Sequence, residues 1–141
     1  GEIGRGGMVG CALGLLTACL EESIKFANER ILYGKPIVKL PAIQDKIAEM
    51  KIDLEAGRLL GYRAASMQDA GTMSSNEFAA AKYFTTEAAI KAAKVAVDIH
   101  GGYGCMEEYA VTRYYRDAAV LGPSAGTSAI MKVIVARWAL S

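Results

Sequence analysis

Apolar residues recur along this chain at intervals of three and four, which predicts helices with one buried face. Two such stripes come first, at about residues 6–32 and 41–70, and charged side chains fall on their other faces. Between them, Gly34, Pro36 and Pro41 exclude a continuous helix. Pro41 suits the first turn of the second helix, where its missing N–H has no helical partner to lose.

The second half of the chain predicts further helices. A third helix follows Ser74, which forms a capping box with Glu77, and it stops at Gly101-Gly102. Its Ala-rich middle would let a neighbouring helix approach closely. A short segment covers about residues 109–118, and a last helix starts near residue 127 or 128 and runs to 138. No stretch shows the alternation typical of a strand.

These segments predict an all-α fold: one antiparallel four-helix bundle with short extra helical segments, forming a single domain over residues 1–141. A composition of 52% hydrophobic and 22% charged residues agrees with one globular domain. A net charge of +1 gives no support to nucleic-acid binding. The longest apolar run, residues 8–20, is too short to span a bilayer. The cysteines, carboxylates and single histidine have no metal-site spacing, so no metal is expected.

Candidate chemistry is concentrated near helix ends. Arg5 lies just ahead of the first helix, and Arg30 precedes a Tyr33-Gly34 turn, where it suits the helix dipole or can reach a phosphate with forked donors. Gly101-Gly102 is either a helix C-cap or a place where a ligand approaches the backbone. Residues 126–128 offer backbone N–H groups at a helix N-terminus. Taken one at a time, each feature has a simple structural explanation.

Taken in order, the segments GR, ERxxYGKPI, IQxKxAEM, HGGYG, RYYRDA and GTSxI resemble the C-terminal domain of the acyl-CoA dehydrogenase family. The resemblance covers essentially the whole chain, from Arg5 to Trp138. In that family the domain is a four-helix bundle that follows a helical domain and a β-domain, and FAD lies between the β-domain and the bundle. The resemblance therefore implies that residues 1–141 are the C-terminal domain of a longer flavoenzyme, and that alone they bind FAD poorly.

The resemblance also implies cofactor-binding residues, namely Arg30, Tyr33, Gly101, Gly102 and Thr127. Arg30 matches the family arginine that contacts the FAD pyrophosphate across a dimer interface, and Tyr33 belongs to the same motif. The two glycines match those that pack against the adenine side of that FAD. Thr127 matches the threonine that contacts the cofactor in the subunit's own site.

Further expectations concern substrate and partners. Glu2 and Arg5 fall where the family places residues that line the acyl-CoA pocket. The resemblance implies an acyl-CoA thioester as substrate, a role in fatty acid metabolism, and self-association as a dimer or tetramer. It also implies electron-transfer flavoprotein as a partner, and a cytoplasmic location or, in a eukaryote, the mitochondrial matrix.

The chain departs from the family at the catalytic carboxylate that removes the α-proton of the substrate. The usual glutamate position, just before Gly-Thr, is Ala125, and the position used by the isovaleryl-CoA type is Gly4. Glu2 is the nearest carboxylate in sequence and a weak candidate to replace it, and Asp98 and Glu108 are further ones. Two cofactor-facing glutamines are also replaced, one by Pro41 and one by Asp98.

Three interpretations of the missing glutamate remain open. In the first, the full-length protein is an acyl-CoA dehydrogenase whose base has moved elsewhere. In the second, it is a flavoenzyme whose reaction needs no α-proton base, as in the desulfinase-type members of the family. In the third, it is a non-catalytic partner subunit whose Arg30, Gly101 and Gly102 complete the FAD site of a catalytic homologue.

Overall fold

The structure is a computed structural model that describes residues 2–123 and 127–141, with side chains from Gly4 onward. Five α-helices run through this part of the chain: α1 (Glu2–Glu29), α2 (Pro41–Asp69), α3 (Ser75–His100), α4 (Ala110–Ala118) and α5 (Ser128–Leu140). The shorter elements are β1 (Ile31–Leu32), β2 (Lys35–Pro36) and two 3₁₀ turns, η1 (Ile37–Lys39) and η2 (Gly101–Cys105). The predicted all-α fold and the order of its segments are confirmed.

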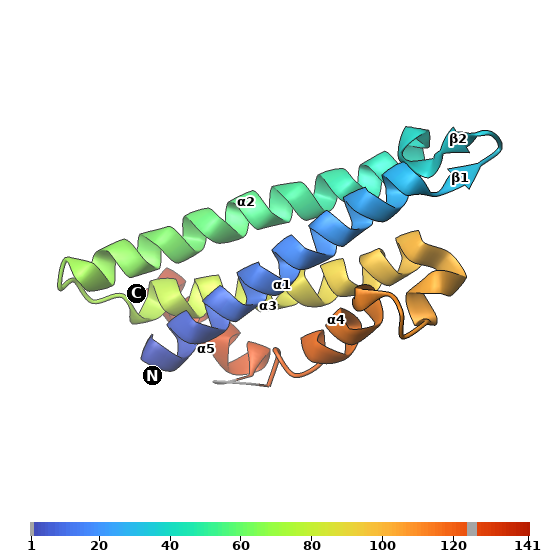
Figure 1. Ribbon diagram of the computed structural model, residues 1–141. Helices are drawn as coiled ribbons and strands as arrows, with labels where there is room; N and C mark the ends of the chain where they lie inside the picture. Colours follow the sequence, from blue (N-terminus) through green and yellow to red (C-terminus); the bar gives the residue numbers. More distant parts are fainter. Residues whose placement is uncertain (1, 124–126) are drawn as a thin grey trace.

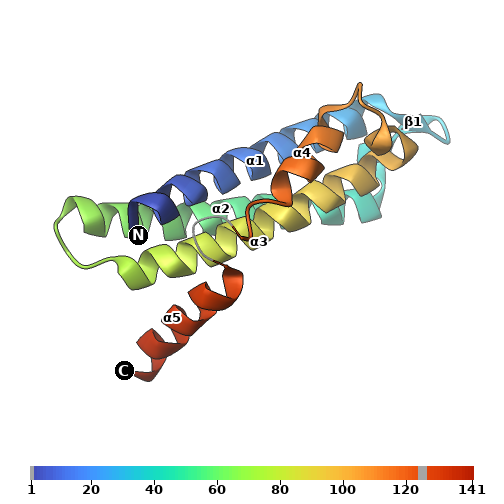
Figure 2. The ribbon, with the colours of Figure 1, turned by 90° about the horizontal axis from the view of Figure 1, so that it is seen from below.

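The body of the molecule consists of α1, α2 and α3, which are long and run antiparallel to one another in sequence order (Figure 1). The central helix is α3, because it packs against α1, α2, α4 and α5. The short α4 lies against α1 and α3, whereas α5 packs against α3 and then projects away from the other helices (Figure 2). The bundle is thus made of three long helices and the pair α4 and α5, with the last helix turned outward.

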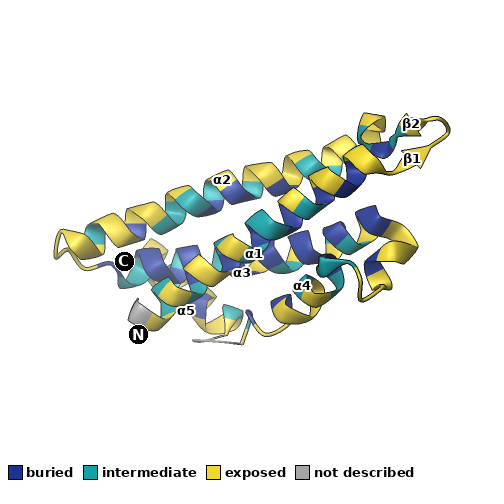
Figure 3. Cartoon of the chain, viewed as in Figure 1, coloured by how far each residue is buried: buried dark blue, intermediate teal, exposed yellow. Residues whose placement is uncertain are grey.

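Small side chains on α3 let the other helices approach it closely, as its sequence predicted. Leu16 and Cys19 of α1 and Leu54 of α2 belong to the same buried cluster as the α3 alanines (Figure 3). At Gly57 of α2, an added Cβ would lie 3.0 Å from Leu13 Cδ2 and 3.1 Å from Thr85 Cγ2. Three helices therefore meet there at a distance that leaves no room for a side chain. The buried alanines of α3 are Ala79, Ala81, Ala88, Ala89, Ala92, Ala93 and Ala96.

Helix ends follow the sequence signals with two exceptions. The first helix was expected over about residues 6–32, but α1 runs from Glu2 to Glu29, and Ile31–Leu32 form β1 instead. Pro41 is the first residue of α2, and Gly71 follows its end with a φ of 74°. Ser74 is the N-cap of α3, but its side chain makes no capping hydrogen bond to the helix. The predicted capping box with Glu77 is therefore wrong, and the Glu77 side chain is instead buried against the bundle.

A two-residue β-ladder joins α1 to η1, in a place where no strand was expected. Ile31 pairs with Pro36 and Leu32 with Lys35. At the tip, Tyr33 and Gly34 have φ angles of 53° and 78°, and positive φ at both central residues is what a type I′ hairpin turn requires. Two residues per strand are too few to produce a recognisable alternation in the sequence.

The first helix is longer than its 13-residue apolar run suggested. Its segment Gly4–Glu29 is long and apolar enough to cross a membrane, judged by length and composition alone. In the fold, α1 packs along α2, α3 and α4, and its Ala12, Leu16 and Cys19 are fully buried. Core helices of helical domains and signal sequences meet the same test, so length and composition do not by themselves indicate a membrane span.

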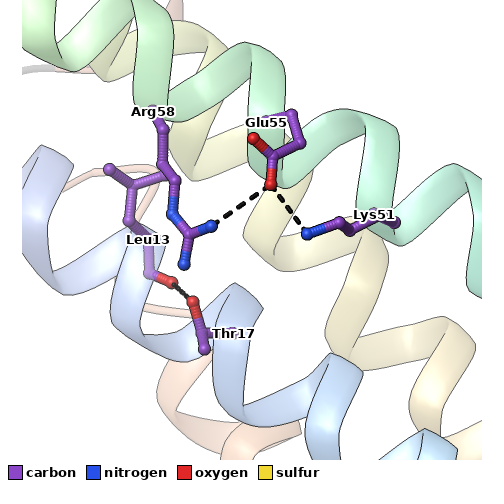
Figure 4. Close-up of polar contacts among 5 residues, drawn as sticks. All are labelled: Leu13, Thr17, Lys51, Glu55 and Arg58. Atoms are coloured by element: carbon purple, nitrogen blue, oxygen red, sulfur yellow. Dashed lines mark hydrogen bonds and ion pairs between the residues drawn. The ribbon is translucent and has the colours of Figure 1, made fainter.

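A small charge network lies on the exposed face of α2. Glu55 Oε1 accepts hydrogen bonds from Lys51 Nζ at 2.7 Å and from Arg58 at 3.2 Å (Figure 4). The hydrogen bond from Lys51 and its positive charge lower the pKa of Glu55. On α1, Thr17 donates its hydroxyl to the Leu13 carbonyl at 2.7 Å, so it is satisfied within its own helix. Exposed ion pairs such as Lys51–Glu55 contribute little to the free energy of unfolding.

Candidate functional site

Three of the five residues expected to contact a cofactor lie together where α1 and α3 end. Arg30 follows α1, and Gly101 and Gly102 follow α3. All three line one open cavity of about 280 Å³, together with Tyr103 and several apolar side chains. We call Arg30, Gly101, Gly102 and Tyr103 the hairpin-end site.

The Arg30 side chain lies over an aromatic ring. Its guanidinium carbon lies 5.5 Å from the centre of the Tyr103 ring, within cation–π distance. The backbone is fixed on both sides, because the Arg30 N–H donates to the Phe26 carbonyl at 2.8 Å and the Arg30 carbonyl accepts from the Ile37 N–H at 2.9 Å. A guanidinium placed over an aromatic ring still has N–H donors for a planar or anionic partner.

The glycines of this turn differ in what the fold demands of them. Gly101 has a φ of 60°, a conformation that favours glycine, whereas Gly102 has no positive φ and an added Cβ would meet nothing within 4 Å. At Gly104, by contrast, an added Cβ would lie 2.6 Å from the Val97 carbonyl oxygen. Gly104 is therefore required by internal packing, and the sequence analysis missed it. Gly102 is not required by the fold, and its bare backbone leaves room for a ligand.

His100 is the only histidine of the chain and lies buried behind the hairpin-end site. Its ring stacks on Phe26 with a centroid separation of 4.2 Å and meets Tyr109 edge-on at 5.7 Å. Its Nδ1 lies 2.8 Å from the Ala96 carbonyl oxygen. Burial lowers the pKa of His100, and the hydrogen bond to Ala96 and the negative charge of Glu22 oppose that shift only in part. The imidazole therefore packs as a neutral ring that supports the glycine turn.

Lowering the pH from about 7.5 to about 5.5 is expected to destabilise the fold through His100. Its pKa in the folded chain lies below the value of about 6.5 for a free imidazole, so the unfolded chain takes up the proton first as the pH falls. The contribution of the neutral ring is fully present above about pH 6.5 and is lost progressively below it. Urea unfolding at a series of pH values measures the slope, which His100→Phe should flatten; equal slopes in both proteins would contradict the assignment.

Tyr33 lies apart from the cavity, at the tip of the β1–β2 hairpin. Its side chain is 92% exposed, and Leu32 rather than Tyr33 lines the cavity. Its φ of 53° is unusual for a bulky residue and costs about 1 kcal/mol. The cofactor contact of Tyr33 stays a prediction.

A second group of predicted residues lies where α1 and α5 begin. Arg5 is half-buried, and its Nε is buried without a hydrogen-bond partner in the part of the chain that the structure describes. Thr127 is the N-cap of α5, and its Oγ1 accepts from the Ile130 N–H at 3.2 Å. A hydroxyl that accepts in this way still has its own proton to donate. The cofactor contact of Thr127 and the substrate contact of Arg5 stay predictions.

Of the two positions that hold the catalytic glutamate in the family, the structure describes only one. Gly4 lies in the first turn of α1 and is exposed. Ala125 lies outside the described residues, as does the side chain of Glu2. Whether Glu2 replaces the missing carboxylate therefore stays a prediction.

Lys82 of α3 also belongs to this second group, although the sequence analysis did not select it. Its side chain is fully buried, and Nζ donates a hydrogen bond to the Gly122 carbonyl at 2.8 Å. Burial lowers the pKa of Lys82, the positive charge of Arg5 lowers it further, and Glu87 opposes the shift. The available signal was a lysine within the apolar stripe of α3. We call Arg5, Lys82, Gly122 and Thr127 the loop-end site, because Lys82 contacts Gly122 and is affected by the charge of Arg5, and Thr127 follows Gly122 in the same α4–α5 connection.

The two sites are far apart. Arg5 lies in the first turns of α1 and Arg30 directly follows its last residue. At a rise of 1.5 Å per residue, the length of helix between them is roughly 38 Å. The hairpin-end and loop-end sites therefore form separate walls that one ligand group cannot bridge.

The two departures from the family glutamines have structural roles. Pro41 opens α2, and the Asp98 carboxylate accepts a hydrogen bond from Lys94 Nζ at 2.6 Å. Asp98 is therefore already engaged within its own helix. Among the described side chains, no group of three or more histidine, cysteine or acidic residues is placed to hold a metal ion.

Comparison with known proteins adds a family match. A family model described as the acyl-CoA dehydrogenase C-terminal domain matches residues 2–140. The 3-(aryl)acrylate reductase of Clostridium sporogenes is 40% identical over 135 residues, which are 96% of this chain and 36% of that protein. The chain thus spans about a third of the length of this curated relative.

Solved structures agree with the sequence matches. The butyryl-CoA dehydrogenase of Megasphaera elsdenii superposes with a TM-score of 0.96 and 34% identity, covering 99% of this chain and 37% of that one. The FAD complex of PigA superposes with a TM-score of 0.93 and 28% identity, covering 96% of this chain and 36% of that one. The likeness therefore includes a protein whose solved structure contains FAD.

Proposed function

This chain belongs to the acyl-CoA dehydrogenase family as its C-terminal domain, and from that premise we propose that it is part of a longer FAD-dependent flavoenzyme acting on acyl-CoA thioesters. The observation that carries the proposal is the cavity that unites Arg30 with Gly101 and Gly102. It offers a cation beside an open backbone, which is the donor set that a dinucleotide cofactor needs.

The residues of the hairpin-end site fit FAD as one wall of its site. The Arg30 guanidinium would pair with the pyrophosphate. Its contact with the Tyr103 ring, at 5.5 Å, would lower the conformational entropy that the side chain loses on binding. Gly102 would let the adenosine part approach the backbone, because no Cβ stands in the way. When bound, FAD supplies a hydride acceptor for oxidation of the acyl chain.

The loop-end site would serve a different part of the reaction. The Thr127 hydroxyl, fixed by its capping bond to Ile130, would donate to the cofactor. Arg5 would line the acyl-CoA pocket with its buried Nε, and Glu2 would lie beside it at the start of α1. Because the two sites lie on separate walls, the hairpin-end site would contact the FAD of a neighbouring subunit, in a dimer or tetramer.

Because glutamate is absent at Ala125 and Gly4, three alternatives remain for the function of the full-length protein. Ordinary α,β-dehydrogenation requires a relocated base, and removing a general base costs about 10²–10⁴ in rate. A base-independent reaction of the desulfinase kind requires none. A partner subunit without chemistry of its own would only complete the FAD site of a homologue.

A panel of acyl-CoA thioesters added to the full-length protein tests these alternatives. Loss of flavin absorbance with a saturated thioester supports dehydrogenation. Release of sulfite or another leaving group without that loss supports the second reaction. Co-purification with a glutamate-bearing homologue and no activity alone supports the third. A full-length protein that binds no FAD, either alone or together with a homologue, would overturn the proposal.

The isolated chain, residues 1–141, is expected to bind FAD weakly. It contributes one wall of the site, so most contacts to the cofactor are missing. Titration of the chain with FAD, followed by absorbance, measures this affinity, and tight stoichiometric binding would contradict the prediction.

We further propose electron-transfer flavoprotein as the electron acceptor, and the cytoplasm or the mitochondrial matrix as the location.

A further inference from the structure

Lys82 is the largest fully buried side chain in the part of the chain that the structure describes. Removing an ammonium group from water is costly. An apolar side chain of similar length would fill the same space without that cost, and such replacements of buried charges are often neutral or stabilising. Packing alone therefore does not account for a lysine at this position.

The ammonium group of Lys82 is directed at the segment that follows α4. Nζ donates to the Gly122 carbonyl at 2.8 Å, which ties two positions 40 residues apart in sequence. Next to Gly122, Leu121 is buried in the core. The start of the α4–α5 connection is thus fastened to α3 by one apolar and one charged contact.

The far end of the connection is fastened to the same helix. Ser128 Oγ donates to Glu87 Oε1 at 2.6 Å. Thr127, directly before Ser128, starts α5 through its bond to the Ile130 N–H at 3.2 Å. Lys82 and Glu87 therefore hold α3 to both ends of the stretch that carries Thr127.

We propose that Lys82 is a positioning residue: together with the Glu87–Ser128 contact, it holds the two described ends of the α4–α5 connection to α3 and so sets the position of Thr127. The consequence for cofactor binding rests on the proposed function of Thr127. The holding of the connection rests only on the contacts of Lys82, Glu87 and Ser128.

Lys82→Met in the full-length protein tests this, because methionine keeps the apolar stem and removes the ammonium. Amide hydrogen exchange of residues 119–122 and 127–131 should become faster by about tenfold or more, as expected for loss of a charge-assisted hydrogen bond. The dissociation constant for FAD should rise about five- to tenfold, while the melting temperature changes by less than about 3 °C. Lys91→Met, which removes an exposed lysine from the same helix, should leave exchange in both segments and FAD affinity unchanged.

Ser128→Ala keeps the proposal testable if Lys82→Met does not fold, because Ser128 forms a surface contact that the core does not need. It should speed exchange in residues 127–131 and weaken FAD binding, with no change in α2. Unchanged exchange in Ser128→Ala, or in a folded Lys82→Met, would overturn the proposal. If the wild-type protein takes up no FAD, the proposed function fails, but the exchange measurements still decide the role of Lys82.

Discussion

A glutamate introduced at Ala125 of the full-length protein is expected to raise the rate of acyl-CoA α,β-dehydrogenation by about a hundredfold or more, the contribution of a positioned general base. The position matches that of the family carboxylate, and the chain retains Thr127, two residues further on, and Arg5. Rapid mixing of a saturated thioester with the FAD-loaded variant, followed by loss of flavin absorbance, measures the rate.

Gly4→Glu is expected to act in the same direction, because the family also uses that position. Gly4 is exposed in the first turn of α1. Gly7→Glu is the matched control: it lies one turn further along α1, is exposed, and an added Cβ meets nothing within 4 Å. Wild-type rates in both Ala125→Glu and Gly4→Glu would show that the missing carboxylate does not limit this protein.

Replacing Gly104 with alanine is expected to destabilise the fold by about 2–3 kcal/mol, since it overpacks a buried site. The new Cβ would lie 2.6 Å from the Val97 carbonyl oxygen and 3.0 Å from Val97 Cα, and backbone atoms cannot move aside as a side chain can. Relief requires moving η2 away from α3, which also displaces Gly101 and Gly102. Urea unfolding measures the loss of stability, and FAD affinity should fall with it.

Gly102→Ala separates packing from ligand binding in the same turn. Its φ is not positive and an added Cβ meets nothing within 4 Å, so stability should stay within about 1 kcal/mol of wild type. FAD affinity should nevertheless fall if the cofactor approaches this backbone. A Gly104→Ala protein as stable as Gly102→Ala would contradict the close approach of η2 to α3.

Most of the fold could be predicted from local signals. Pro41 and Gly71 mark the ends of α2 where they were expected, because proline and glycine act on the backbone at their own position. The hairpin at Tyr33-Gly34 was missed because two residues per strand show no periodicity. The capping box at Ser74 was wrong because tertiary burial of Glu77 overrides its local partner.

The candidate site was predictable in part. Its residues were selected by resemblance to a family, and the structure brings Arg30, Gly101 and Gly102 into one cavity while leaving Tyr33 outside it. Nothing in the sequence separates Gly102, which the fold does not need, from Gly104, which it does. That difference depends on the distance between η2 and α3, which is set by the tertiary packing of the two elements.

The sequence by itself determined the helices of this protein, the limits of the second one, its family and the absence of glutamate at Ala125 and Gly4, because periodicity, helix breakers and residue identity are local properties. Only the tertiary structure decided which residues meet. It placed Arg30 beside a glycine turn from the far end of α3, and it buried Lys82 beneath Gly122. Such contacts join residues distant in sequence, and they form because the long helices must bury their apolar faces against one another.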